Sequence, residues 1–149
     1  MMPLKTDSVC SVLGKAGASY HPFTIPLFGC KISAGFASPA DDHLEKNIDL
    51  NELLIKKPAA TFMLRVEGDS MIGAGIHDGD LLIVDRSVTP SNGSIVIAVV
   101  DGGLTVKRLN KLGGRVRLMP ENPKYSAIEI LEGEELMIWG CVRHVVHNV

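Results

Sequence analysis

From residue 60 to the C-terminus, short apolar runs alternate with tight turns, and this alternation constrains the fold more than any other feature of the chain. The β-like runs cover residues 61–66, 81–84, 94–100, 104–109, 116–119 and 136–146. Glycine, asparagine and aspartate separate them, and Asp101-Gly102-Gly103 is typical of a hairpin turn. Six or more short strands with regular turns predict a compact, mostly antiparallel β domain.

The first 34 residues differ in composition from the rest. They contain three glycines and three prolines, with one acidic residue against three lysines. Residues 20–25 have some β character, but the prolines make this segment an edge strand at best. We therefore predict that residues 1–34 form an extended arm and that the strand core lies wholly after residue 34. The apolar spacing in residues 44–55 predicts a short helix and turn, closed by Pro58.

Composition argues against several classes of protein. At 149 residues the chain is expected to form one domain, or one domain with a tail. A formal net charge of −2 argues against a large nucleic-acid-binding surface. No apolar run reaches the length of a membrane span, and the N-terminus lacks a signal-peptide pattern. A cytoplasmic location follows as the default expectation.

The cysteines and histidines do not predict a metal site. Cys10, Cys30 and Cys141 are an odd number without metal-ligand spacing, so neither a disulfide framework nor a zinc site is indicated. The five histidines are scattered, and surface or edge packing is the expected role of each. His144 and His147 lie three residues apart in a strand pattern, hence on opposite faces, which disfavours a shared metal. We expect no metal and no cofactor.

Ser70 lies in a turn of the sequence Glu67-Gly68-Asp69-Ser70-Met71. Gly68 and Asp69 favour a sharp bend, which can present a hydroxyl group at the end of a strand. The alternative is a serine that only stabilises the turn or caps a helix. Taken alone, Gly-Asp-Ser is weak evidence for a nucleophile.

Lys107 follows 37 positions later, in the strand-like run at residues 104–109. A lysine accepts a proton from serine only when it is neutral, whereas an ordinary lysine, with a pKa of about 10.4, is charged at pH 7. Desolvation can lower that value by about 3–5 units. Alternation places Lys107 and Arg108 on opposite faces of the strand. The alternative is a lysine that faces solvent.

The bond between Ala34 and Gly35 joins two small residues in a loop. Small side chains allow a nucleophile to approach closely, and glycine adopts backbone conformations closed to other residues. An ordinary flexible linker is the alternative. Together, the serine, the lysine and this bond are the parts of a self-cleaving serine–lysine protease.

From residue 25 to the end, the chain resembles the UmuD proteins of the SOS mutagenesis response, relatives of the LexA repressor. The matching blocks appear in the family's order and spacing, at residues 36–42, 48–54, 68–71, 78–85, 105–107 and 144–146. The resemblance implies the β fold of the LexA and UmuD C-terminal protease domain. One difference is Ala-Gly at the cleavage site, the pair used by LexA-like repressors, where the best-known UmuD has Cys-Gly.

The resemblance also implies roles for individual residues. Ser70 would be the nucleophile, Lys107 the general base and Ala34-Gly35 the scissile bond. Backbone N–H groups of Ser70 and Met71 are expected to stabilise the oxyanion, since the turn places them beside the nucleophile. Cleavage would remove residues 1–34 and leave residues 35–149 as the β-rich peptidase domain.

The partners are also implied by the resemblance alone. UmuD proteins form homodimers, cleave themselves when stimulated by a RecA–single-stranded DNA filament, and then join a Y-family polymerase subunit, UmuC, for translesion synthesis. Direct sequence-specific DNA binding and membrane association are not expected. The sequence leaves open whether cleavage occurs within one subunit or between two.

Three other readings compete with a UmuD-like autoprotease. A LexA-like or phage-type repressor would need an N-terminal DNA-binding domain, which 34 residues interrupted by glycine and proline do not supply. A signal-peptidase-like enzyme should carry a membrane anchor. A non-catalytic β-rich binding module would remain uncut.

Overall fold

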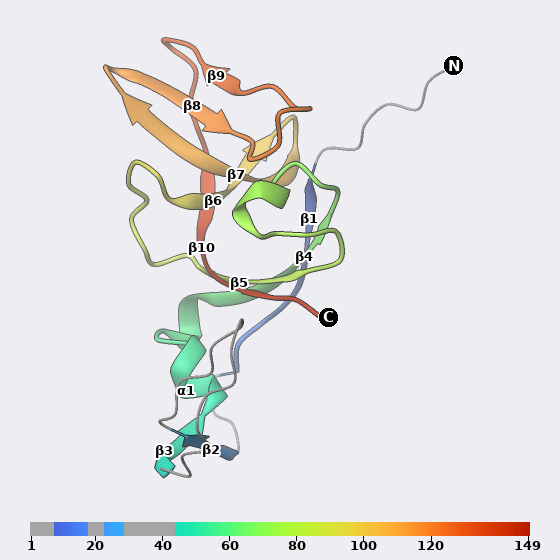
Figure 1. The fold of residues 1–149 in the computed structure, drawn as a ribbon. Coiled ribbons are helices and arrows are strands. Elements are labelled where there is room, and N and C mark those ends of the chain that lie inside the picture. The colour runs from blue at the N-terminus through green and yellow to red at the C-terminus, as the bar shows by residue number, and fades with distance from the viewer. Residues whose placement is uncertain (1–7, 18–22, 29–43) are drawn as a thin grey trace. The chain divides into compact units, whose positions relative to one another are not determined.

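The apolar runs after residue 60 form strands of an antiparallel barrel in the computed structural model, which describes residues 8–17, 23–28 and 44–149 (Figure 1). Its strands, in the order in which neighbours are hydrogen-bonded, are β1 (Val9–Lys15), β4 (Thr61–Glu67), β5 (Leu81–Asp85), β10 (Ile138–Val146), β6 (Ile95–Val100) and β7 (Gly103–Leu112). Val9 of β1 also pairs with Thr105 of β7, so these six described strands close on themselves.

Two further strands extend the sheet beyond β7. β8 (Arg115–Met119) pairs with β7, and β9 (Ile128–Ile130) pairs with β8. The predicted hairpin between β6 and β7 has Asp101 and Gly102 at positive φ, 50° and 78°, as a two-residue turn of this kind requires. Each β-like run predicted after residue 60 overlaps a strand, although the runs at 94–100 and 136–146 begin one and two residues before β6 and β10, and this confirms the mostly antiparallel β fold.

The apolar core follows from the alternation of side chains along these strands. One cluster joins buried residues of the barrel strands with two from the segment after β4: Cys10, Leu64, Val66, Met71, Ile76, Leu82, Val84, Ile97 and Val106. A second cluster contains Val96, Ala98, Leu109, Leu118 and Cys141. Because successive residues of a strand point to opposite faces, β6 and β7 contribute to both clusters.

The strand β1 corrects the prediction for the N-terminal segment. It pairs with β4 from Val9 to Lys15, with an irregularity between Val12 and Gly14. The expectation that the strand core lies wholly after residue 34 is therefore wrong. Of the residues in β1 only Cys10 is buried, so the strand is held chiefly by backbone hydrogen bonds and lacks the apolar alternation that predicts strands.

Residues 23–28 and 44–56 belong to a second unit, separate from the barrel. There β2 (Thr24–Phe28) pairs with β3 (Leu44–Asp49), which is followed by α1 (Leu50–Leu54). The helix predicted for residues 44–55 is thus wrong in its first half. The Asp49 side chain accepts a hydrogen bond from the Asn51 backbone N–H at 2.9 Å, which caps the helix and fixes its start.

Short 3-10 turns precede β4 at η1 (Pro58–Ala60) and follow it at η2 (Ile72–Ala74). Among the described helices, none has the length and apolar character that crossing a membrane would require.

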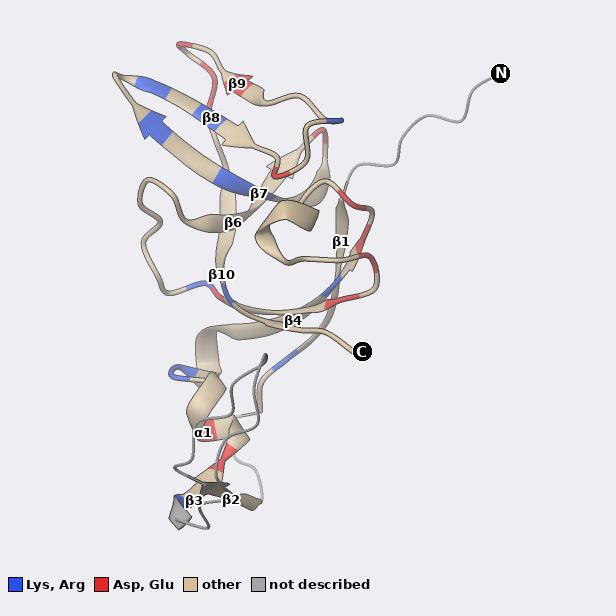
Figure 2. Cartoon of the chain, in the orientation of Figure 1, with Lys and Arg blue, Asp and Glu red and all other residues tan. Residues whose placement is uncertain are grey.

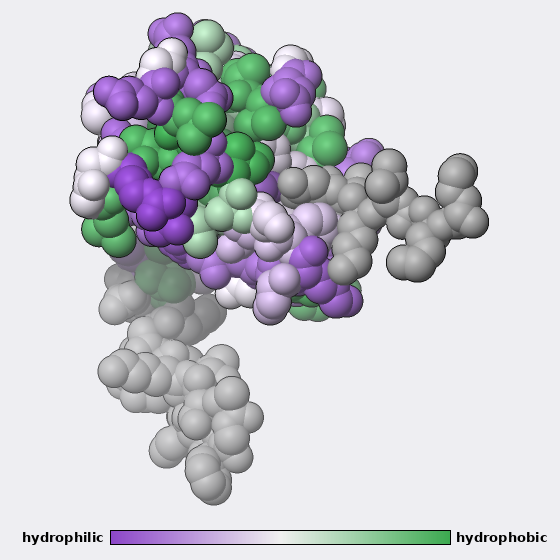
Figure 3. Space-filling model, turned by 90° about the horizontal axis from the view of Figure 1, so that it is seen from above, coloured by the Kyte–Doolittle hydropathy of each residue, from purple (hydrophilic) through white to green (hydrophobic). Residues whose placement is uncertain are grey.

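Charged side chains of both signs are distributed over the strands and turns. Figure 2 shows Lys and Arg on β7 and β8, with Asp and Glu in the turns that flank the barrel strands. Figure 3 shows hydrophobic and hydrophilic residues side by side on the face seen from above. This mixture differs from the continuous basic stripe that is typical of nucleic-acid-binding proteins.

Candidate active site

Ser70 lies in the turn that leads from β4 into η2, as the sequence predicts. Gly68 has a φ of 102°, a conformation that favours glycine, and its N–H donates to Asp78 Oδ1 at 2.8 Å. This bend turns the chain inward immediately after β4. As a result Ser70 is completely buried.

Lys107 lies at the middle of β7 and is also completely buried. Its neighbour Arg108 is on the other face, where its Nε donates to Glu121 Oε1 at 2.5 Å. The predicted opposite orientation of the two side chains is confirmed. The alternative of a solvent-facing Lys107 is excluded.

The two buried side chains contact each other. Lys107 Nζ lies 3.1 Å from Ser70 Oγ, 3.1 Å from Thr105 Oγ1 and 3.2 Å from the Val106 carbonyl oxygen. A neutral amine has two N–H groups and one lone pair. If Thr105 and Val106 accept the two N–H groups, the lone pair is left for the Ser70 O–H, which is the arrangement that activates a serine nucleophile.

Thr105 and Ser8 connect this pair to the N-terminal segment. Thr105 Oγ1 donates to the Ser8 carbonyl oxygen at 2.6 Å, so its lone pairs are available to Lys107 Nζ. Ser8 Oγ in turn accepts a hydrogen bond from the Ser70 N–H at 3.1 Å. Sequence analysis missed both residues. Thr105 could have been found, because it lies two positions before Lys107 on the same strand face.

Residues 121–125, which follow β8, hold the turn that contains Ser70 in place. Asn122 Nδ2 donates to the Asp69 carbonyl oxygen at 2.9 Å, and the Glu121 N–H donates to the Ser70 carbonyl oxygen at 2.8 Å. Tyr125 Oη also donates to an Asp69 carboxylate oxygen. These contacts fix the backbone on both sides of Ser70. Nothing in the sequence pattern brings residues 121–125 to this turn.

Ser70 and Lys107 lie beside the apolar core. Met71 and Val106, the chain neighbours of Ser70 and Lys107, belong to the same buried cluster as Cys10. Burial raises the pKa of the Cys10 thiol to about 12, although the Lys107 charge lowers it in part. The surroundings of the Cys10 thiol therefore disfavour its charged form.

Two predicted parts of the site stay predictions. Ala34 and Gly35 lie outside the described residues. Met71 is buried at the start of η2, and the role of its N–H in stabilising an oxyanion stays a prediction.

Comparison with known proteins supports a peptidase. Residues 26–143 match the family described as Peptidase S24-like. The chain is 49% identical to the protein SamA of Salmonella typhimurium over 125 residues, which cover 84% of this chain and 86% of SamA. It is 44% identical to the protein MucA of Escherichia coli over 134 residues, covering 89% of this chain and 90% of MucA. It is also 39% identical to the LexA repressor of Photorhabdus laumondii over 125 residues, covering 83% of this chain but 61% of LexA.

Proposed function

The chain belongs to the Peptidase S24-like family, and on this premise we propose that it is a self-cleaving serine protease with Ser70 as nucleophile and Lys107 as general base. Membership of the family confirms the resemblance to the LexA and UmuD proteins. The observation that carries the proposal is the 3.1 Å contact between Lys107 Nζ and Ser70 Oγ in a completely buried site.

The reaction begins when Lys107 takes the proton of Ser70 as Oγ attacks the carbonyl carbon of Ala34. Backbone N–H groups of Ser70 and Met71 stabilise the negative charge on the carbonyl oxygen. The protonated lysine then gives its proton to the departing amine of Gly35. Water hydrolyses the acyl-enzyme, with Lys107 again accepting the proton.

Thr105 positions the lysine during these steps. Its Oγ1 and the Val106 carbonyl oxygen lie 3.1 and 3.2 Å from Nζ and hold the two N–H groups of the neutral amine. The lone pair is then directed at Ser70. Fixing the base in this way removes part of the entropic cost of proton transfer.

The biological role proposed for the chain is that of the UmuD proteins. Cleavage at Ala34-Gly35 would separate residues 1–34 from residues 35–149. A homodimer of the cut chain would then act as accessory subunit of a Y-family polymerase in translesion synthesis, with cleavage stimulated by RecA on single-stranded DNA. A repressor role has less support, since the chain is 39% identical to the LexA repressor that it matches, against 49% for SamA and 44% for MucA.

Intact-mass spectrometry of the purified chain tests the protease. We expect slow cleavage between Ala34 and Gly35, faster as the pH rises from 7 to 10, because a protonated lysine cannot accept the serine proton. Ser70→Ala and Lys107→Ala should remain uncut yet folded, as checked by circular dichroism. Lys111→Ala, a change of an exposed lysine on the same strand, should be cut at the wild-type rate.

An uncut wild-type chain at alkaline pH, or a cut at another bond, would contradict the assignment. The biological role has a separate test. We expect faster cleavage with a RecA–single-stranded DNA filament and ATP, and tighter binding of a polymerase subunit by the cut chain. Equal rates and equal binding would leave the protease in place and remove the SOS role.

A further inference from the structure

A second group of polar side chains lies where the end of β10 meets the turn before β5. The two strands pair antiparallel with Val146 opposite Leu81, so the next residues outward, His147 and Asp80, come together. His77 enters the same group because the Asp80 N–H donates to its carbonyl oxygen at 3.1 Å and closes the turn. The expectation that the histidines are scattered is thus wrong for two of the five.

Asp80 is the fixed centre of this group. Its side chain is only 3% exposed, and both carboxylate oxygens are engaged. Oδ2 accepts from the His77 backbone N–H at 2.7 Å, and Oδ1 lies 2.6 Å from His147 Nδ1. A buried carboxylate needs such partners, and these hold it in one orientation.

His77 contributes a buried ring nitrogen to this group. Its Nδ1 is buried and has no hydrogen-bond partner among the described residues. This nitrogen lies 3.7 Å from Asp80 Oδ2, and the His77 ring centre lies 4.7 Å from that of His147. A buried polar atom without a partner calls for an explanation, and here it is close to a carboxylate and a second imidazole.

We propose that His77, Asp80 and His147 bind a divalent transition metal ion of the zinc class. One donor atom from each residue lies within 4.8 Å of the others. A tetrahedral zinc ion, with bonds of about 2.0–2.2 Å, holds its donors about 3.4 Å apart. The two imidazoles are 43% and 45% exposed, so small rotations of these rings close the remaining distance.

The donor set selects the class of metal. Two imidazole nitrogens and one carboxylate oxygen suit zinc, cobalt or nickel, whereas calcium and magnesium take six or more oxygen ligands. The ion would take the place of the hydrogen bond between His147 Nδ1 and Asp80 Oδ1, so Nδ1 carries no proton in the bound state and the ring keeps its proton on Nε2. Water completes the coordination from the adjoining surface pocket, which is lined in part by Gly79, Leu81 and Asn148.

Arg65 limits the affinity. It also lines this pocket, and its guanidinium donates to the Gly79 carbonyl oxygen at 3.0 Å. A positive charge close to the ion opposes binding. We therefore expect weaker binding than at a structural zinc site with four protein ligands. The ion ties residue 147 to the turn before β5, so it should raise the melting temperature of the barrel.

The test uses the untagged, full-length Ser70→Ala chain, so that cleavage cannot confuse the result. After treatment with EDTA it is titrated with Zn²⁺ by calorimetry and with Co²⁺ by visible d–d absorption. We expect one ion per chain and a higher melting temperature with Zn²⁺ but not with Mg²⁺. His77→Gln and His147→Gln should each lower the affinity about tenfold or more.

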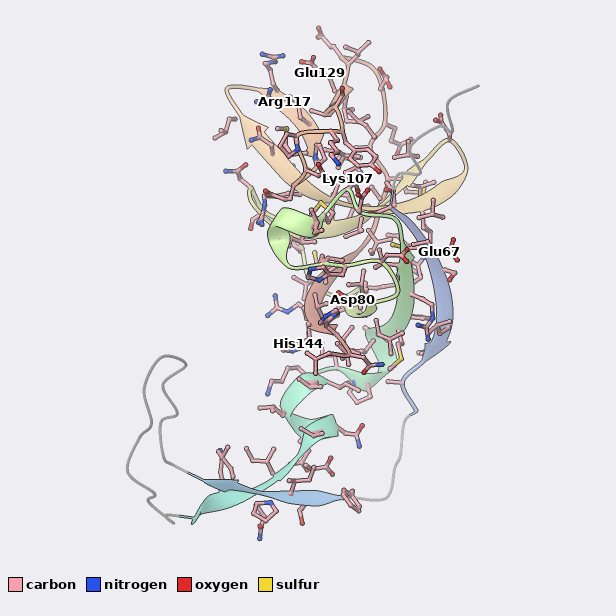
Figure 4. All side chains as sticks on the ribbon, turned by 45° about the vertical axis from the view of Figure 1, so that its right-hand side comes forward. Glu67, Asp80, Lys107, Arg117, Glu129 and His144 are labelled. Carbon is pink, nitrogen blue, oxygen red and sulfur yellow. The ribbon has the colours of Figure 1, made fainter. Side chains whose placement is uncertain are left out.

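His144→Gln is the matched control and should leave binding unchanged, since His144 lies on β10 (Figure 4) and is not one of the three residues of the cluster. Circular dichroism checks that each variant folds. Absence of binding by the parent chain would overturn the proposal. So would affinity retained in both His77→Gln and His147→Gln. Neither outcome bears on Ser70 and Lys107, because the parent chain already lacks the nucleophile.

Discussion

Ser8 Oγ accepts a hydrogen bond from the backbone N–H of Ser70 at 3.1 Å. Ser8 belongs to the segment that cleavage at Ala34-Gly35 would separate from the rest of the chain. The Ser70 N–H is also one of the two groups predicted to stabilise the oxyanion. In this arrangement the N-terminal segment competes with the reacting carbonyl oxygen for the same donor.

Replacing Ser8 should therefore accelerate cleavage. Ser8→Ala removes the competing acceptor, and a hydrogen bond of about 0.5–1.5 kcal/mol corresponds to an increase in rate of about 2- to 10-fold. The measurement is a cleavage time course by intact mass at fixed alkaline pH. Ser11→Ala, at an exposed position of β1, is the control. A slower Ser8→Ala chain would mean that Ser8 supports the active geometry.

The Thr105 hydroxyl should be needed to position Lys107. Thr105→Val keeps the shape of the side chain but removes the oxygen 3.1 Å from Nζ, and we expect cleavage about 10- to 100-fold slower. Thr105→Ser should retain most of the rate. The pH profile distinguishes positioning from a general loss of stability. Loss of the oxygen beside the Lys107 amine should move the pH at which the cleavage rate is half-maximal. A general loss of stability should lower the rate without moving that pH.

The sequence predicts the central parts of the fold and site but not their surroundings. Gly68 indicates the bend at Ser70, and alternation along the strand predicts that Lys107 and Arg108 lie on opposite faces. These signals are local. The strand β1 has one buried residue and depends on pairing with β4, and His147 reaches Asp80 only through the register of β10 against β5. Such long-range pairings leave no periodic pattern in the chain.

Gly73 should tolerate no side chain. Its N–H donates to the Glu121 carbonyl oxygen at 2.7 Å, and a Cβ atom would lie 2.6 Å from the same oxygen. Gly73→Ala should lower the free energy of unfolding by about 1–3 kcal/mol and slow cleavage, because residues 121–125 hold the Ser70 turn. Urea unfolding measures the first effect. Gly14→Ala, where a Cβ would meet no atom within 4 Å, should change stability much less.

The thiol of Cys10 should react only slowly at neutral pH. Burial raises its pKa from the ordinary value of 9.0 to about 12, so the reactive thiolate is about a thousandth of the total at pH 9. In a Cys30→Ser, Cys141→Ala chain, the rate of reaction with Ellman's reagent should rise about tenfold per pH unit through pH 9. In urea it should level off near pH 9. If the reaction rate of the folded chain also levelled off near pH 9, the raised pKa of Cys10 would be contradicted.

The same shift predicts how stability depends on pH. The unfolded chain ionises its thiol near pH 9, while the folded chain keeps Cys10 protonated to about pH 12. The contribution of this protonated thiol is therefore present below pH 9 and is lost as the pH rises towards 12. Urea unfolding of the parent and Cys10→Ala chains at pH 8 and pH 10 measures how much the protonated Cys10 thiol contributes to the free energy of unfolding at each pH.

Cleavage alone should not release the N-terminal fragment. β1 pairs with β4 from Val9 opposite Glu67 to Lys15 opposite Phe62, and β2 pairs with β3, so both strands described before the cut are hydrogen-bonded to segments after it. We expect the two fragments to elute together in native size-exclusion chromatography and apart in denaturant. A body of residues 35–149 that elutes alone straight after cleavage would contradict this expectation.

Proline substitutions in β1 would show whether this pairing retains the fragment. Successive N–H groups of a strand point to opposite sides, so either Ser11→Pro or Val12→Pro must remove a hydrogen bond to β4. The variant that does so should lose the fragment sooner after cleavage. Loss of β1 would leave unpaired edges on β4 and β7, which form the kind of surface that accepts a strand from another protein. The timing of fragment loss would then set when the cut chain becomes competent to bind a partner.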